Sequence, residues 1–400
     1  NIGMILFASL AGVIVGLGVI LLLAHNWQAI PRGGKLALIL GSLLAAHGAG
    51  MWQIRAGRRG LGEGLNLLGT MLFGAGIWLI AQIYHIDEHY PNAFLFWSLG
   101  AMGLAWALPS VPQAALACVL IPVWCGVEGF DFSRGMHAGP LILAGWVATL
   151  AFRLRSAFLL TVAIPAFFLS LLFVLFNLPC PAHAHGGLIF SVLLNFGVAL
   201  ITATYLWPRG GGFEAAPMIL GFYGRFLALG LIYLLTFPHF ADDVLPSAWN
   251  QAAFSVKLYT VVFAALAAAL WLKVAVAGRR GQTEAPPGDE WLFPLAAAWA
   301  ALHLFLPVIH ADEWLTALPF NLILLALIVA LMTRGCRQGL RGPTAVGSIL
   351  LVLLMLARYF DLFESLWVRG LVFIGVGVAL FVQGLIYRRV RRTRLEGGPR

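Results

Sequence analysis

The sequence predicts an all-α protein that crosses a membrane many times. Hydrophobic residues make up 61% of its 400 positions and charged residues only 10%, and the mean hydropathy is +0.91. A water-soluble fold of this length would lack the polar residues needed to cover its surface. The apolar residues come in long runs without the period-2 alternation of barrel strands, and lipid cannot satisfy the edge of an open sheet. We therefore predict a polytopic transmembrane helical protein.

The number of spans follows from the length of the apolar runs. One crossing needs about 20 mostly apolar residues, and runs separated by Gly, Pro and charged residues predict about fourteen spans, with about twelve as the lower bound. The predicted spans are 2–23, 36–54, 62–83, 93–108, 112–128, 138–152, 157–178, 187–206, 217–237, 252–274, 291–309, 317–332, 344–358 and 366–387. The run 112–128 is short, and Pro109, Pro112 and Pro122 leave open a re-entrant piece or a half-helix there.

The chain divides at one polar stretch that contains Pro and Gly. Residues 278–290 form a predicted cytoplasmic linker between an N-terminal membrane domain, 1–277, with about ten helices and a C-terminal four-helix segment, 291–387. A basic cytoplasmic tail, 388–400, follows and is expected to be attracted to anionic lipid. The chain begins at Asn1 without an initiator Met, so we expect an upstream segment.

Charged loop residues predict the orientation. If every run crosses once, eighteen Lys and Arg fall on one side and five on the other. Because cytoplasmic loops are enriched in Lys and Arg, both termini are predicted to be cytoplasmic. The formal charge of +9 is thus explained by short loops, which excludes a nucleic-acid-binding surface. The opposite, periplasmic face collects eight of the ten His and ten of the sixteen acids, which the positive-inside rule does not explain for His.

Polar chemistry is densest where the span 62–83 ends. Gln82 and Tyr84 lie where this run leaves the hydrocarbon, and two His, one Asp and one Glu follow within residues 85–89 with no Lys or Arg beside them. Such groups can transfer protons at a membrane surface. We predict a periplasmic cavity built from the loops 24–35, 84–92, 238–250, 310–316 and 358–369.

The residues of this cavity are assigned roles as follows. The predicted proton-transfer or ligand groups are His85, Asp87, Glu88 and Asp361. Arg358 is the predicted anion clamp, because a guanidinium binds phosphate or carboxylate bidentately, although it could instead neutralise Asp361 three positions later. The other predicted substrate-binding residues are Tyr84, Gln82, His25, Asn26 and Trp27. If a divalent metal binds, the candidate ligands are His85, His89, His183, His185 and His310, but solvated loop histidines give the same pattern.

Three functions remain open on these residues. The first is an integral inner-membrane protein that binds or processes an extracytoplasmic or lipid-linked anionic substrate. The second is a proton- or ion-coupled transporter or channel with Arg225, His47 and His303 along its path, although the sequence offers no mid-span carboxylate and no inverted repeat. The third is a non-catalytic subunit whose outer loops dock another protein. The expected partners common to all three are membrane lipids.

Three stretches carry a resemblance to a known family. They are Ala24-His25-Asn26-Trp27 with Ile30-Pro31 and Lys35, then Gly74-Ala75-Gly76 through Gln82-Ile83-Tyr84-His85-Ile86, and finally Arg358-Tyr359-Phe360-Asp361-Leu362-Phe363. Together they resemble the bacterial predicted-membrane-protein family catalogued as domain of unknown function 2157 (DUF2157), with the family-like region over about residues 1–110. The resemblance implies a bacterial inner (plasma) membrane location and transfers no activity.

Overall fold

The computed structural model describes residues 30–85, 89–179, 182–208, 212–244, 254–281, 285–305, 313–361, 374–378, 381–386 and 388. Within these ranges the regular structure is helical and contains no strand, which confirms the all-α prediction. Eight of the described helices are long and apolar enough to cross a membrane. The span count of about fourteen and the cytoplasmic termini stay predictions, and the predicted span 2–23 lies outside the described residues.

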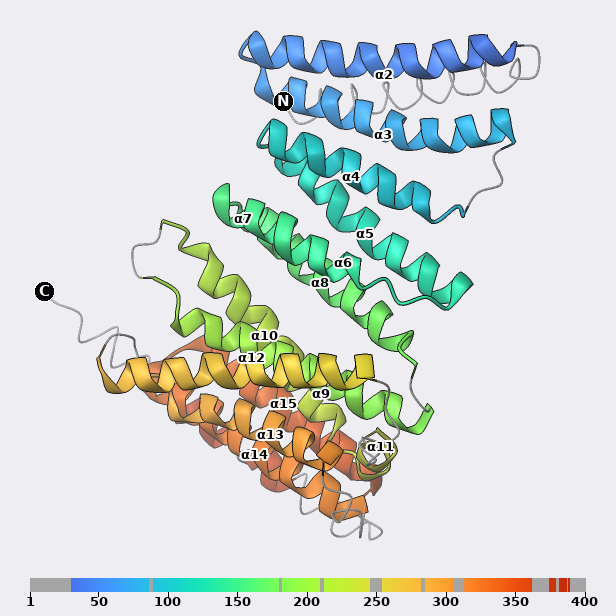
Figure 1. The fold of residues 1–400 in the computed structure, drawn as a ribbon. Coiled ribbons are helices and arrows are strands. Elements are labelled where there is room, and N and C mark those ends of the chain that lie inside the picture. The colour runs from blue at the N-terminus through green and yellow to red at the C-terminus, as the bar shows by residue number, and fades with distance from the viewer. Residues whose placement is uncertain are drawn as a thin grey trace, which may run out of the picture. The chain divides into compact units, whose positions relative to one another are not determined.

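The chain forms two compact units, Asn1–Leu171 and Leu172–Arg400. The described helices of the first unit are α2 (Arg32–Arg55), α3 (Arg59–Tyr84), α4 (Asn92–Ala107), α5 (Val111–Phe132), α6 (Ala138–Ile142), the π-helical turn η2 (Leu143–Ala148), α7 (Thr149–Arg153) and α8 (Ala157–Phe176), in which the boundary falls. Figure 1 shows α2 to α5 as successive helical hairpins, with α3 packed on α2 and α4 packed on α5.

Small residues set the spacing between the first helices. In α3, a Cβ on Gly62 would meet the backbone of Gly50 in α2, and a Cβ on Gly74 would overlap the indole of Trp97 in α4. Glycine at these positions lets helices approach closely in lipid, where packing replaces the hydrophobic effect as the driving force. Between α2 and α3, Nδ1 of His47 lies 3.1 Å from Oδ1 of the buried Asn66. His47, a predicted transport-path residue, is therefore bound within the α2–α3 contact.

The prolines do not interrupt α5. It runs as one helix of 22 residues with Pro112 in its first turn and Pro122 inside it, so the half-helix interpretation of run 112–128 is wrong. Pro112 occupies a turn whose N–H groups have no intrahelical partner, so it removes no hydrogen bond there. Pro122 removes one interior bond, but it is buried among packed neighbours, as are Ile121 and Trp124.

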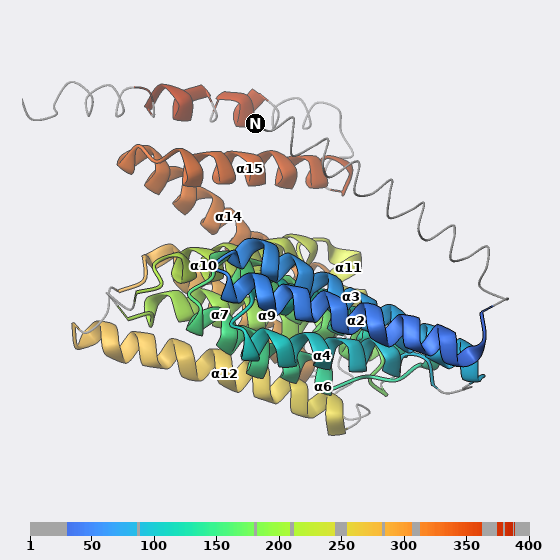
Figure 2. The same ribbon diagram turned by 90° about the horizontal axis from the view of Figure 1, so that it is seen from above.

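The second unit is arranged around one buried helix. Its elements are α9 (Ala182–Tyr205), α10 (Ala215–Leu234), α11 (Pro238–Val244), α12 (Phe254–Arg279), the 3₁₀ turn η4 (Gly288–Trp291), α13 (Leu292–Phe305), α14 (Glu313–Gln338) and α15 (Arg341–Asp361). In the apolar window of α9, Gly186–Tyr205, 72% is buried, the largest share of the eight long helices. Helix α9 contacts α10, α11, α12 and α13. Helix α14 packs against α15, and both can be followed in Figure 2. The predicted loop 238–250 begins with the short helix α11.

Candidate functional site

The end of α3 brings the first polar groups to the site. His85 caps the helix in the left-handed conformation, with φ 51° and its N–H bonded to the carbonyl of Ala81. Left-handed backbone at the C-cap is common for Gly and costs a residue with a Cβ about 1–2 kcal/mol. Helix α3 therefore ends abruptly at Tyr84, and the chain turns away with the exposed imidazole of His85 at its end.

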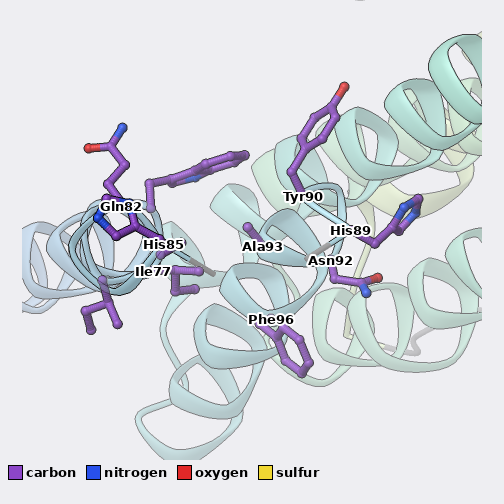
Figure 3. A pocket seen from close by; sticks show the side chains of 11 residues that line it. Ile77, Gln82, His85, His89, Tyr90, Asn92, Ala93 and Phe96 are labelled. Carbon is purple, nitrogen blue, oxygen red and sulfur yellow. The ribbon is translucent and has the colours of Figure 1, made fainter. Parts of the chain in front are cut away.

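A groove of about 910 Å³ lies along α3, the α3–α4 loop and the start of α4 (Figure 3). Its lining residues are Ile77, Trp78, Ile80, Ala81, Gln82, His85, His89, Tyr90, Asn92, Ala93 and Phe96. Apolar side chains come from the bodies of both helices, whereas amide, imidazole and phenol groups gather at the loop. Binding sites for small molecules are of this size and are mostly apolar with a few placed polar groups.

The α3–α4 loop is fixed to α5 by a buried carboxylate. Nε2 of His89 lies 2.7 Å from Oε1 of Glu128, whose side chain is 2% exposed. Among the described residues, the other oxygen of Glu128 is buried without a hydrogen-bond partner. A carboxylate so removed from water is costly unless it is paired and hydrogen-bonded. Glu128 therefore fixes the orientation of the His89 ring, and His89 reaches both this carboxylate and the groove.

A second contact lies one helical turn further along α5. The phenol of Tyr90 donates a hydrogen bond to Oδ2 of Asp131. The hydrogen bond to Asp131 is the main cause that raises the pKa of Tyr90, with burial and the charges of Asp131 and Glu128 acting in the same direction. The rings of His89 and Tyr90 both pack against Phe132, with centroids 4.2 and 5.6 Å away. Consecutive loop residues thus bind two acids at i and i+3 on α5, the spacing that places side chains on one helix face.

The structure brings together only part of the predicted site. His85 and Gln82 line the groove, and Tyr84 is exposed at the end of α3 without lining it. Figure 3 shows His89 pointing away from His85. Across the described ranges, no group of three or more His, Cys, Asp or Glu is placed to hold a metal ion.

The remaining predicted residues fall outside what the structure describes. Asp87, Glu88, His25, Asn26, Trp27, His303 and His310 are in this class, either entirely or for their side chains. His183 and His185 lie on α9, and Arg358 and Asp361 on α15, but their side chains also lie outside the described part.

Sequence reasoning missed Glu128 and Asp131 as members of the site. Glu128 ends the predicted span 112–128 and Asp131 follows it, but nothing in the sequence pairs them with His89 and Tyr90, about 40 positions earlier. The available indication was their spacing, Glu-x-x-Asp at the end of an apolar run, which places two carboxylates on one face of a helix.

A separate polar centre lies in the second unit. Nε and Nη2 of Arg225, in the middle of α10, donate to Oε1 of Glu290 at 2.9 and 2.7 Å. Glu290 belongs to η4, in the predicted linker, and is 2% exposed. The preceding residue, Asp289, pairs with Arg334 of α14 at 3.1 Å. Arg225, a predicted transport-path residue, is thus bound to a carboxylate that sequence analysis had placed outside the membrane.

Comparison with known proteins supports the membrane assignment. Residues 1–114 match the model of the family described as predicted membrane protein (DUF2157), in agreement with the resemblance found in the sequence. No curated protein and no solved structure matches the chain. The chain is a membrane protein with several apolar helices. Every lining residue of the groove lies within the matched segment, whereas Glu128 and Asp131 lie beyond it.

Proposed function

We propose that this protein binds an amphipathic, lipid-linked substrate in the groove along α3 and α4, on the periplasmic side of the bacterial inner membrane. The chain of the substrate lies along Ile77, Ile80 and Phe96, and its head group lies at Gln82, His85 and Asn92. The single observation that carries this proposal is the two-part lining of the groove, apolar along the helices and polar at the loop.

The polar part of the groove is what separates a specific ligand from bulk lipid. Lipid tails are about as apolar as leucine, so an apolar groove alone does not select one lipid over another. Buried or half-buried polar groups that pair with one head group do select, because a lipid that lacks the matching groups leaves them unpaired. Asn92 is a half-buried group of this kind, and the exposed Gln82 and His85 add further polar groups at the point where the helices meet the loop.

The site also contains groups suited to proton transfer. A general base is recognised by a third group that orients it, and His89 with Glu128 has this arrangement at 2.7 Å. We propose that His89 or His85 moves the proton if the bound substrate is processed. The assignments of Asp87 and Glu88 to proton transfer remain proposals for this loop. The roles of Asp361 in proton transfer and of Arg358 as an anion clamp remain separate proposals, because both residues belong to the second unit and not to the groove.

Photo-crosslinking from inside the groove tests the binding proposal. A benzophenone amino acid at Phe96, which lines the groove, should form a lipid adduct whose composition differs from that of the membrane. The matched control is Phe158 of α8, which is similarly exposed and does not line the groove. Ala81→Trp should fill the groove and reduce the adduct at Phe96. Equal yields and bulk lipid composition at both positions would refute the proposal.

Cysteine labelling tests the side of the membrane on which the groove opens. In a cysteine-free parent, Tyr84→Cys at the end of α3 should react with a membrane-impermeant maleimide in intact cells. Arg58→Cys, in the α2–α3 connection, should react only after permeabilisation. Reaction of both residues from the same compartment would contradict the predicted orientation.

A carrier is the second candidate, and one observation favours it. The sequence offers no mid-span carboxylate, but in the structure Glu290 is buried against Arg225 in the middle of α10. Glu290 belongs to the 3₁₀ turn η4, which leads directly into α13. Ionisable side chains buried among membrane helices often mark a transport path. In proteoliposomes with an imposed pH gradient, Glu290→Gln should then abolish proton flux, whereas Asp289→Asn should retain it. Equal fluxes in both variants would count against the carrier.

A further inference from the structure

We infer that the head group recognised by the groove is an uncharged, hydroxyl-rich glycan, so that the ligand is a glycolipid or a lipid-linked sugar. The inference rests on the proposed function and narrows its substrate class. Two independent features of the lining carry it: a pair of aromatic rings at the polar end, and amide and imidazole groups that can pair with hydroxyl groups.

The aromatic pair is Trp78 and Tyr90. Their ring centroids are 6.1 Å apart and their planes are inclined by 46°. Trp78 is held from another side by an edge-to-face contact with Phe94, at 5.5 Å. Both rings line the groove. The face of an aromatic ring carries negative partial charge and attracts the polarised C–H groups that a sugar ring presents on its apolar face. Two inclined, pre-positioned faces are therefore suited to a sugar ring.

The hydrogen-bonding groups beside these rings are neutral amides and an imidazole. Gln82 and Asn92 each offer an acceptor oxygen and a donor NH₂ group, and His85 offers a ring nitrogen. A sugar hydroxyl also donates and accepts, so it can satisfy either end of an amide. Gln82 and His85 are exposed at the end of α3, so a ligand can reach both side chains.

The charge of the described lining argues against a phosphate head group. Phosphate recognition uses Arg, Lys or a cluster of N–H donors, and the groove residues include no Lys or Arg. The nearby acids, Glu128 and Asp131, are bound by His89 and Tyr90 and add negative charge to this end of the first unit. An anionic lipid would be repelled where a neutral glycan is not.

Native mass spectrometry of the full chain in nanodiscs tests this inference. The probes are a diacyl monoglucosyl glycerol lipid, phosphatidylglycerol and phosphatidylethanolamine, offered in equal amounts. The glycolipid should be retained about tenfold more than either phospholipid, because stacking on the aromatic rings and pairing of the sugar hydroxyls both add to its binding.

Matched variants separate recognition from folding. Trp78→Leu should lower glycolipid retention about tenfold, whereas Trp78→Phe keeps an aromatic face and should lose less. The control is Trp146→Leu, because Trp146 is an exposed residue of η2 that does not line the groove. Gln82→Leu changes an exposed side chain, so it should fold and still lose glycolipid selectivity.

The outcomes distinguish the two proposals. If lipid crosslinks at Phe96 but phosphatidylglycerol is retained as well as the glycolipid, the glycan inference fails and the proposed groove stands. If Phe96 crosslinks to a peptide of this chain or to no lipid, both fail. Selective glycolipid retention that survives in Gln82→Leu and Trp78→Leu would also overturn the inference, because the lipid would then bind elsewhere.

Discussion

Nε2 of His89 lies 2.7 Å from Oε1 of Glu128, and this contact joins the α3–α4 loop to a helix 39 positions further along the chain. Glu128 is almost fully buried, and His89 lines the groove. The hydrogen bond between them therefore fixes the α3–α4 loop on α5 and orients the His89 ring. The neighbouring contact of Tyr90 with Asp131 repeats the arrangement nearer the surface.

Removal of Glu128 should destabilise the first unit. Glu128→Leu leaves the half-buried His89 without its partner, which costs about 1–3 kcal/mol, and Glu128→Gln should cost less because an amide oxygen can still accept. The measurement is the free energy of unfolding in detergent, with a double-mutant cycle through His89→Ala. The control is Glu63→Gln, which removes an exposed i, i+4 pair with Arg59 and should cost at most about 0.5 kcal/mol. A vanishing coupling between positions 89 and 128 would contradict the structure.

The pKa of Tyr90 provides a second test. Its folded value is raised, mainly by the hydrogen bond to Asp131. The contribution of this contact to stability is therefore fully present below the ordinary tyrosine pKa, about 10, and is lost as pH rises through the higher folded value. Asp131→Asn removes both the charge and the carboxylate acceptor, so it should lower the pKa of Tyr90.

Tyrosinate absorbance against pH measures this pKa. The difference between the wild type and Tyr90→Phe gives the titration of the single residue, and Tyr84→Phe is the control for an exposed tyrosine six positions earlier. A Tyr90 titration that does not move in Asp131→Asn would show that the phenol donates elsewhere.

The close approach of α3 and α4 depends on Gly74. A Cβ at this position would overlap the Trp97 indole, whereas a Cβ on Gly103 of α4 meets nothing within 4 Å. Gly74→Ala should therefore destabilise the protein by about 1–3 kcal/mol through overpacking, and Gly103→Ala should be neutral or stabilise it by up to about 1 kcal/mol. Thermal unfolding of both variants measures the difference in stability.

Gly74→Ala should also alter the Phe96 crosslinking yield, because α3 and α4 form the walls of the groove. The same melting temperature for both variants would contradict this packing.

The sequence predicts well what depends on local pattern and poorly what depends on long-range pairing. The end of α3 near Tyr84 was predictable because an apolar run meets polar residues there, and the structure ends the helix at that residue. The partner of His89 was not predictable, because all of α4 and most of α5 separate His89 from Glu128 in the sequence. The continuity of α5 through Pro122 also depends on surrounding packing, which no local rule contains.

Arg225 is the clearest case of a residue whose role changed when its neighbours were known. In the sequence it was a cation inside a predicted span with no acid nearby, and such a residue suggests a transport path. Its partner, Glu290, is 65 positions away in a stretch that reads as a solvated linker. Composition could not predict that η4 places one acid against α10 and the preceding one against α14.

The two halves of the Arg225–Glu290 pair should not be equally costly to remove. The side chain of Arg225 is 36% exposed and that of Glu290 is 3% exposed. Arg225→Met leaves a buried carboxylate without its cation and should cost about 3–5 kcal/mol at pH 7. Glu290→Leu leaves a guanidinium that can turn toward water and should cost less. The double variant, Arg225→Met with Glu290→Leu, should recover much of the loss, because an apolar pair can replace a buried ion pair.

Unfolding free energies in detergent measure all three variants. The control is Arg334→Met, which should have a smaller effect because its partner, Asp289, is less buried than Glu290. Equal costs for Arg225→Met and Glu290→Leu would show that burial of the remaining partner does not govern this pair.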